Sequence, residues 1–170
     1  MGPPIAGPAN GDDVIFTNTT MFYHRYAEAM ANLATKHGGD AKVKALAAKM
    51  KTAQAPEIKQ MAGWLVGGKL PVPSLENGVV KGHSMAGMGG ETTQMMSNQD
   101  MAALGKMSGS AFDRRWLQMM VKHHEGALVT AKEELAKGLN TGAKSVAQSV
   151  IDRHSAEIAT MKSLLTGIPG

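Results

Sequence analysis

Imidazole and thioether side chains share an apolar stripe on each of two helices expected near the end of the chain. Met120 lies one turn before His124 on the first stripe, and His154 lies two turns before Met161 on the second. The turn between these helices is centred near residue 139, so an antiparallel hairpin places position 124 opposite position 154. Imidazole and thioether ligands together suit copper, Cu(I) in particular, better than Mg²⁺, Ca²⁺ or Mn²⁺.

A purely structural role is the alternative for these residues. A single histidine on an apolar stripe is more often a hydrogen-bonded core residue than a ligand, and methionine commonly fills gaps in a core. Two histidines that face each other change that balance in favour of a metal site. His123 points about 100° away from His124 on the same helical turn and forms a second possible ligand pair with Met119.

Soft ligands also recur between residues 68 and 109, in a segment rich in glycine and proline. This segment contains His83, Met85 and Met88, and further methionines follow at positions 95, 96, 101 and 107. Methionine repeated in a glycine-rich loop has no core of its own to pack, which favours a tether for a soft metal ion. The alternative is a loop that folds back over the molecule and inserts its methionines.

Four long helices must position these side chains. Apolar spacing, N-cap residues and terminal glycines predict helices over about 13–37, 40–66, 110–137 and 141–166, and a short helix from residue 97 or 98 to 104. Pro56 lies inside the second helix and is expected to kink it or to break it locally. The helical hairpins 13–67 and 110–167 can bury their apolar stripes only against each other. We therefore expect an all-α four-helix bundle, one domain over 1–170, with the long crossover 68–109 between its hairpins.

A gapless internal repeat relates the two hairpins, because residue n matches residue n+100. The first hairpin retains His24 and Met61 as candidate ligands, but it has Tyr23 and Gln54 where the second hairpin has histidine. We expect a mainly structural role for the first hairpin, with His24 contributing one ligand from across the bundle. The identical pairs are 13/113, 24/124, 27/127, 31/131, 38/138, 44/144, 47/147, 57/157, 58/158, 61/161, 65/165 and 67/167.

Composition excludes several other functional classes. The chain has 170 residues, fourteen methionines and no cysteine, which excludes disulfide scaffolds, thiolate metal sites and a cysteine nucleophile. Its net charge is +4, but the basic residues are spread along the chain, which gives little support to nucleic-acid binding. No apolar stretch is long enough for a membrane span, and the start does not read as a signal peptide, so the protein is either cytoplasmic or has lost a leader. A ferritin-type di-iron centre needs Glu-x-x-His, whereas this chain has the reversed order His154-x-x-Glu157.

The segments GHSMAGM, FDRRWLQMMVKHHEGAL and RHSAEIATMKSLL resemble the bacterial CopM-like family, long catalogued as a domain of unknown function. The resemblance covers residues 13 to 167 and implies a ferritin-like four-helix bundle, a periplasmic or secreted location, and copper binding linked to copper tolerance. Met119, Met120, His123 and His124 match the family motif residue by residue. The final helix has His154 where family members often have glutamine, and the first repeat departs from the motif on both sides of position 24.

These observations lead us to expect an extracytoplasmic protein, without catalytic turnover, that sequesters copper or hands it to a protein partner. A metal-dependent redox enzyme, for example one that oxidises Cu(I) with dioxygen, is one alternative. A metal-free helical module that uses the methionine-rich crossover as an adaptable binding surface is the other. The candidate ligands for Cu(I), Cu(II) or both are His124, His154, Met120, Met161, His123, Met119, His24, Met61, His83, Met85 and Met88.

Overall fold

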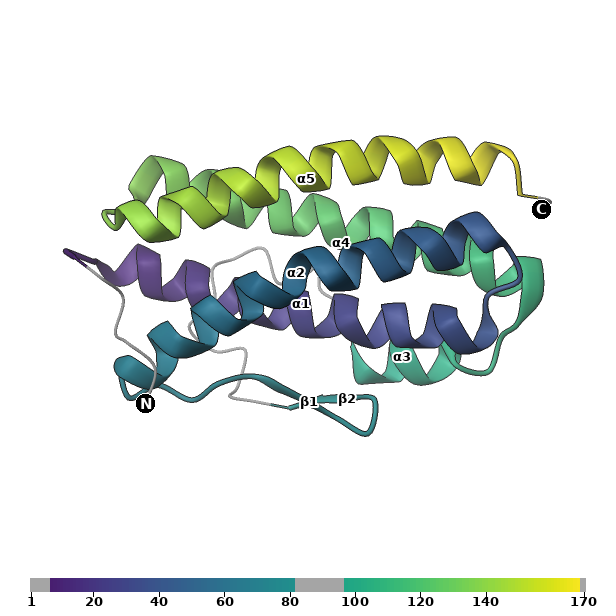
Figure 1. Ribbon diagram of the computed structural model, residues 1–170, viewed down its shortest axis with the longest axis horizontal. Helices are drawn as coiled ribbons and strands as arrows, with labels where there is room; N and C mark the ends of the chain where they lie inside the picture. Colours follow the sequence, from purple (N-terminus) through teal and green to yellow (C-terminus); the bar gives the residue numbers. More distant parts are fainter. Residues whose placement is uncertain (1–6, 82–96, 169–170) are drawn as a thin grey trace.

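Four long helices form two antiparallel hairpins that pack side by side (Figure 1). The computed structural model describes residues 7–81 and 97–168. The long helices are α1 (Gly11–His37), α2 (Ala41–Gly67), α4 (Gly109–Lys137) and α5 (Thr141–Thr166). The short helix α3 (Asn98–Leu104) and a two-stranded hairpin, β1 (Ser74–Glu76) and β2 (Val79–Lys81), pack against α1. The predicted all-α bundle is confirmed.

Side-chain caps explain why the helices begin close to the predicted residues. Asn10 caps α1, Asp40 caps α2, Ser97 caps α3 and Asn140 caps α5, each by accepting a backbone N–H of the first turn. Pro56 lies inside α2, but the helix is unbroken there. The ribbon of α2 changes direction part-way along its length (Figure 1), so of the two expected outcomes, a kink or a local break, the structure has the kink.

The strand pair β1–β2 was not predicted from the sequence. Asn77 and Gly78 form the turn with φ values of 53° and 79°, the left-handed conformation that both central residues of a type I′ turn require. The strands are antiparallel, with Leu75 opposite Val80. Asn98 of α3 holds this hairpin, because its side chain bonds both the N–H and the carbonyl of Val80. Asn-Gly between short apolar stretches is the signal that could have found it.

Two aspartates join the hairpins at opposite ends of the bundle. Asp113 at the start of α4 accepts the backbone N–H groups of Gly39 and Asp40, in the turn between α1 and α2, at 3.1 and 2.8 Å. Asp13 at the start of α1 accepts the corresponding groups of Leu139 and Asn140, between α4 and α5, at 3.1 and 3.0 Å. Each hairpin therefore supplies the acceptor that completes the turn of the other, and we call these contacts the two aspartate latches.

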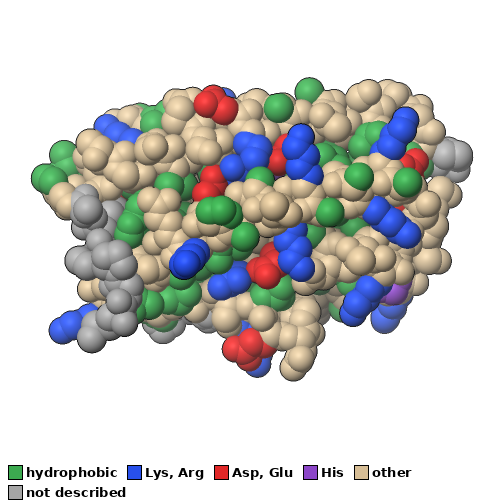
Figure 2. Space-filling model, in the orientation of Figure 1, with side chains coloured by type: hydrophobic (Ala, Val, Ile, Leu, Met, Phe, Trp, Pro, Cys, Tyr) green, Lys and Arg blue, Asp and Glu red, His purple; other side chains and the backbone are tan. Residues whose placement is uncertain are grey.

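The apolar core is divided into two clusters. One contains Trp116, Met120 and Met161, and the other contains Phe16 and Met61. Along α2, α4 and α5, buried polar residues separate the positions that belong to one cluster from those that belong to the other. On the outer surface, basic and acidic side chains are interspersed over the face shown in Figure 2. Within residues 7–81 and 97–168, no helix is long and apolar enough to cross a membrane.

Candidate metal centre

A layer of polar side chains, between one and three from each long helix, lies between the two apolar clusters, and all of its members are buried except Arg153, which is partly buried. We call it the histidine layer; its members are His24 of α1, Gln54 and Glu57 of α2, His123 and His124 of α4, and Arg153, His154 and Glu157 of α5. The four histidines are at most 1% exposed. Their presence here follows from the helical spacing, which places each of them on the face that the bundle buries.

Three imidazole rings from three helices stack in a row. The ring centroids of His124 and His154 are 3.9 Å apart with an interplanar angle of 24°. The centroids of His24 and His154 are 6.3 Å apart with an angle of 17°. The prediction that His124 and His154 meet across the hairpin is therefore confirmed, and His24 lies beside them from the first hairpin, as expected.

Each half of the bundle contains the same short carboxylate–imidazole contact. Nε2 of His24 lies 2.6 Å from Oε2 of Glu57, and Nε2 of His124 lies 2.6 Å from Oε2 of Glu157. A carboxylate only accepts hydrogen bonds, so each Nε2 carries a proton and donates it. When such a ring is neutral, its Nδ1 atom has an unshared electron pair.

The Nδ1 atoms of the stacked rings make no hydrogen bond. In the described part of the chain, Nδ1 of His24, His124 and His154 is buried without a hydrogen bond, and Nδ1 of His154 lies 4.0 Å from Oε2 of Glu157. Buried polar atoms are nearly always bonded, so three orphaned nitrogens in one layer require an explanation. A metal-ligating histidine commonly donates its other ring N–H to a carboxylate, which is the arrangement found at His24 and His124.

Arg153 connects the two carboxylates of the layer. Its guanidinium donates two hydrogen bonds to Glu57, both at 2.8 Å, and its Nε lies 3.8 Å from Oε1 of Glu157. Ser149 adds a weaker bond to Glu57 at 3.3 Å. Burial by itself raises the pKa of Glu57, but the hydrogen bonds with His24 and Arg153 outweigh it and lower that pKa to about 2.

Burial favours the neutral form of His124 and His154, which is the form that binds metal ions. Burial lowers the pKa of His124, although its bond to Glu157 opposes the shift. Burial, reinforced by the adjacent His124, lowers the pKa of His154 well below its ordinary value. Neutral imidazole is the form that binds metal ions, so these two rings do not have to release a proton when they bind one.

His123 occupies a different environment from the other three rings. Its Nε2 lies 2.7 Å from the backbone carbonyl of Tyr23, to which it donates, and its ring packs 4.7 Å from the Tyr23 ring. Its centroid is 6.3 Å from that of His124. Burial lowers the pKa of His123 to about 3, and its Nδ1 is also unbonded among the described residues. His123 therefore packs against Tyr23 and is not part of the stacked row.

The candidate methionine ligands lie in the apolar clusters that border the layer. Met119, Met120 and Met161 belong to one cluster. Met61 belongs to the other cluster. All four are buried, which the core-filling alternative also predicts. The candidates His83, Met85 and Met88 lie outside the described residues.

Sequence reasoning missed the carboxylates and the arginine as members of the site. His124, His154 and Glu157 form a group whose possible ligand atoms all lie within 4.8 Å of one another. The repeat carried the signal for the carboxylates, since it keeps a glutamate 33 residues after a histidine in both hairpins. Arg153 has no such signal, because position 53 is alanine.

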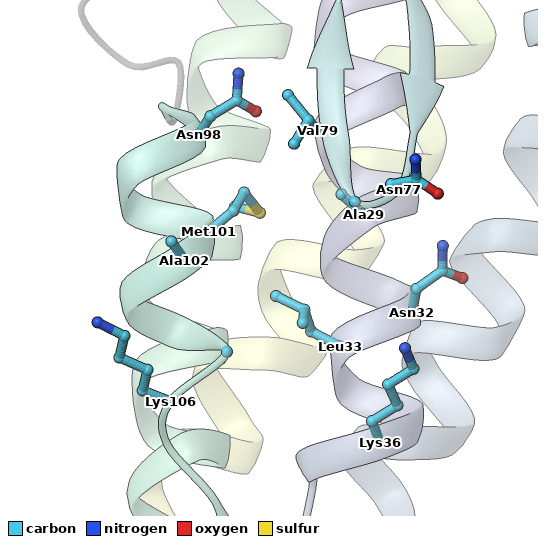
Figure 3. A pocket seen from close by; sticks show the side chains of 12 residues that line it. Ala29, Asn32, Leu33, Lys36, Asn77, Val79, Asn98, Met101, Ala102 and Lys106 are labelled. Atoms are coloured by element: carbon cyan, nitrogen blue, oxygen red, sulfur yellow. The ribbon is translucent and has the colours of Figure 1, made fainter.

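A separate groove of about 650 Å³ lies between α1, α3 and the tip of the strand pair (Figure 3). Leu33 and Met101 point into it, and Lys36 and Lys106 lie on its two sides. It includes no member of the histidine layer. The groove and the candidate metal centre are thus different features of the molecule.

The fold and the sequence were compared with those of known proteins. Among curated proteins, none is significantly similar to this chain. A DUF305 protein from Streptomyces coelicolor, inferred to be secreted, is 26% identical, with a TM-score of 0.78 over 92% of this chain and 93% of that one. A DUF305 fragment from Deinococcus radiodurans, 21% identical, has a TM-score of 0.78 over 95% of this chain and 100% of that one and shows the same fold.

Two further solved structures contain copper. CopM in the Cu(I)-bound form is 26% identical, with a TM-score of 0.70 over 91% of this chain and 96% of that one. CopM in the Cu(II)-bound form is also 26% identical, with a TM-score of 0.71 over 92% and 96%. The sequence model of a domain of unknown function, DUF305, matches residues 13–165. The stacked buried histidines thus belong to a bundle with copper-binding structural neighbours, and the chain is a member of the DUF305 family.

Proposed function

We propose that this protein binds copper ions inside the bundle, at the histidine layer, with His124 and His154 as the first ligands. His24 and the carboxylate of Glu157 adjoin this pair and complete the donor set. The protein holds copper, or passes it to a protein partner, without catalytic turnover. Its expected location is outside the cytoplasm, and its expected contribution is to copper tolerance.

The orphaned imidazole nitrogens are the observation that carries this proposal. In the described residues all four histidines of the layer have a buried Nδ1 without a hydrogen bond, and three of these atoms belong to the stacked row. Leaving a buried acceptor unbonded costs about 1–3 kcal/mol, and a bound ion would supply the missing partner. Two of the rings are oriented by carboxylates in the way that metal-ligating histidines usually are.

The chemistry of the donors favours copper among the common metal ions. Imidazole suits copper, zinc, iron and nickel, and buried thioethers on both sides of the layer favour Cu(I). The CopM structures with Cu(I) and with Cu(II) support copper binding in this fold family. A site without thiolates stays available in an oxidising compartment, and the Streptomyces coelicolor relative inferred to be secreted supports that location.

An anaerobic Cu(I) titration against a chromophoric chelator tests the proposal. The wild type is compared with His124→Ala/His154→Ala and with His37→Ala, a control that removes a half-buried imidazole outside the layer. We expect saturable binding that the double variant loses and the control retains. Full retention by the double variant would place the site elsewhere in the chain, and no binding by the wild type would refute the proposed function.

A further inference from the structure

The histidine layer contains one permanent positive charge. Counted at formal charges with the imidazoles neutral, its charged groups are the carboxylates of Glu57 and Glu157 and the guanidinium of Arg153. The charges of these three groups sum to −1. The side chains of Arg153 and Glu57 are 21% and 11% exposed, so water screens them only partly.

This charge breaks the symmetry between the two hairpins. The carboxylate–imidazole contact at 2.6 Å occurs in both halves, but the guanidinium is present only in the second, because position 53 is alanine. Arg153 spans the space between α5 and α2 and binds Glu57 with both terminal nitrogens. Such a bidentate pair fixes the guanidinium in place. Arg153 therefore keeps its positive charge at a fixed position in the layer.

We propose that Arg153 is a specificity-determining residue, which makes the histidine layer prefer a monovalent metal ion over a divalent one. The inference rests on the proposed function, since it concerns the ion bound at the same layer. Arg153 has no electron pair to donate and is not a ligand. It acts through its charge and through the carboxylate of Glu57 that it holds.

The sign of the preference follows from the charge of the layer. One monovalent ion brings the net charge of −1 to zero, whereas one divalent ion leaves it at +1. Residual charge is costly where the surroundings are poorly hydrated. A unit charge within about 10 Å, at an effective dielectric constant of about 20, changes the relative affinity for ions that differ by one charge by about tenfold or more.

A series of variants changes this charge in steps. Arg153→Ala makes the layer −2, Glu57→Gln makes it 0, and both Arg153→Lys and the double variant Arg153→Ala/Glu57→Gln leave it at −1. Arg114→Ala is the matched control, because it removes an arginine that bonds the carbonyl of Ile168 outside the layer. Each purified protein is first tested for folding by circular dichroism and thermal unfolding without metal.

The dissociation constants for Cu(I) and for Cu(II) are then measured separately at pH 8 by competition with chelators. We expect the preference for Cu(I) to fall at least tenfold in Arg153→Ala, which equals a 59 mV decrease in the reduction potential of the bound copper. It should rise in Glu57→Gln, and it should return toward the wild-type value in Arg153→Lys and in the double variant. The control should match the wild type.

Two failures are distinguishable in this experiment. A wild type that binds neither ion refutes the proposed function itself. If the wild type binds both ions, two results overturn the charge argument alone. One is a preference for Cu(I) that stays constant through the series. The other is a preference that falls whenever Arg153 is lost, even when Glu57→Gln restores the net charge. A purely structural role for Arg153 predicts weaker binding of both ions in the double variant, with no recovery by compensation.

Discussion

Replacing Glu134 by glutamine should stabilise the protein at neutral and alkaline pH. Glu134 is 1% exposed, and the Asp13 carboxyl adjoins it, while neither of its carboxyl oxygens has a satisfied hydrogen bond among the described residues. Burial and the neighbouring Asp13 raise the pKa of Glu134 to about 8. Asp13 itself accepts three backbone N–H groups, so it is the partner that stays ionised while Glu134 keeps a proton.

The sign and size of the effect follow from linkage. A glutamate that titrates near 4.5 in the unfolded chain and near 8 in the folded one contributes stability that is complete below pH 4.5 and is lost as the pH rises to 8. At 1.36 kcal/mol for each pKa unit, the loss has an upper limit of about 5 kcal/mol. Coupling to Asp13 and relaxation of the chain reduce it, so we expect about 2–4 kcal/mol.

Urea unfolding at pH 5, 6, 7 and 8 measures this loss. The free energy of unfolding of Glu134→Gln should exceed that of the wild type by an amount that grows steadily across the series. Glu133→Gln is the control, because Glu133 is the exposed neighbour on the same helix and pairs only with Lys137. Equal pH dependence in the wild type and in Glu134→Gln would show that Glu134 is ionised in the folded protein, and the reasoning would be refuted.

Three further substitutions test the fold and the layer. Asp113→Ala leaves two backbone donors unbonded and should destabilise the protein by about 2–4 kcal/mol in urea unfolding, with a mild effect counting against the latch. Gly78→Ala should cost about 1 kcal/mol, because its φ of 79° strains an alanine; an unchanged melting temperature would contradict this. Glu57→Gln should lower the free energy of unfolding by about 2–3 kcal/mol at pH 7. The ionised Glu57 stabilises the fold above pH 4.5, and this stabilisation is lost as the pH falls toward 2. A difference between variant and wild type that is the same at pH 2 as at pH 7 would contradict the prediction.

The helices and the central histidine pair could be predicted because their signals are local. Caps such as Asp40 fixed the helix starts to within a residue or two, and the single turn near 139 fixed which position lies opposite His124. The strand pair has an equally local signal in Asn77-Gly78, which is typical of a hairpin turn and lies inside the expected crossover 68–109. The layer's electrostatics could not be predicted, because the Arg153–Glu57 contact joins residues 96 positions apart that no periodicity relates.

The roles of the methionines show another limit of sequence reasoning. Helical spacing placed Met120 and Met161 on the buried face, which is where they lie. The same spacing serves a core residue and a soft ligand equally, so burial does not separate the two roles. The unbonded Nδ1 atoms of the histidine layer are a different kind of evidence, because they depend on which hydrogen bonds each ring already makes, and they concern the imidazoles alone.

The two aspartate latches also determine how the chain completes its folding. Asp13 and Leu139 are 126 residues apart in sequence, and Asp113 and Gly39 are 74 apart. Neither turn can therefore be finished by its own hairpin, and each waits until the other hairpin has docked. Contacts at such separation form late, after the entropy of closing a long loop has been overcome. Loss of one latch leaves the turn of the other hairpin without its acceptor, so we expect the two hairpins to unfold cooperatively.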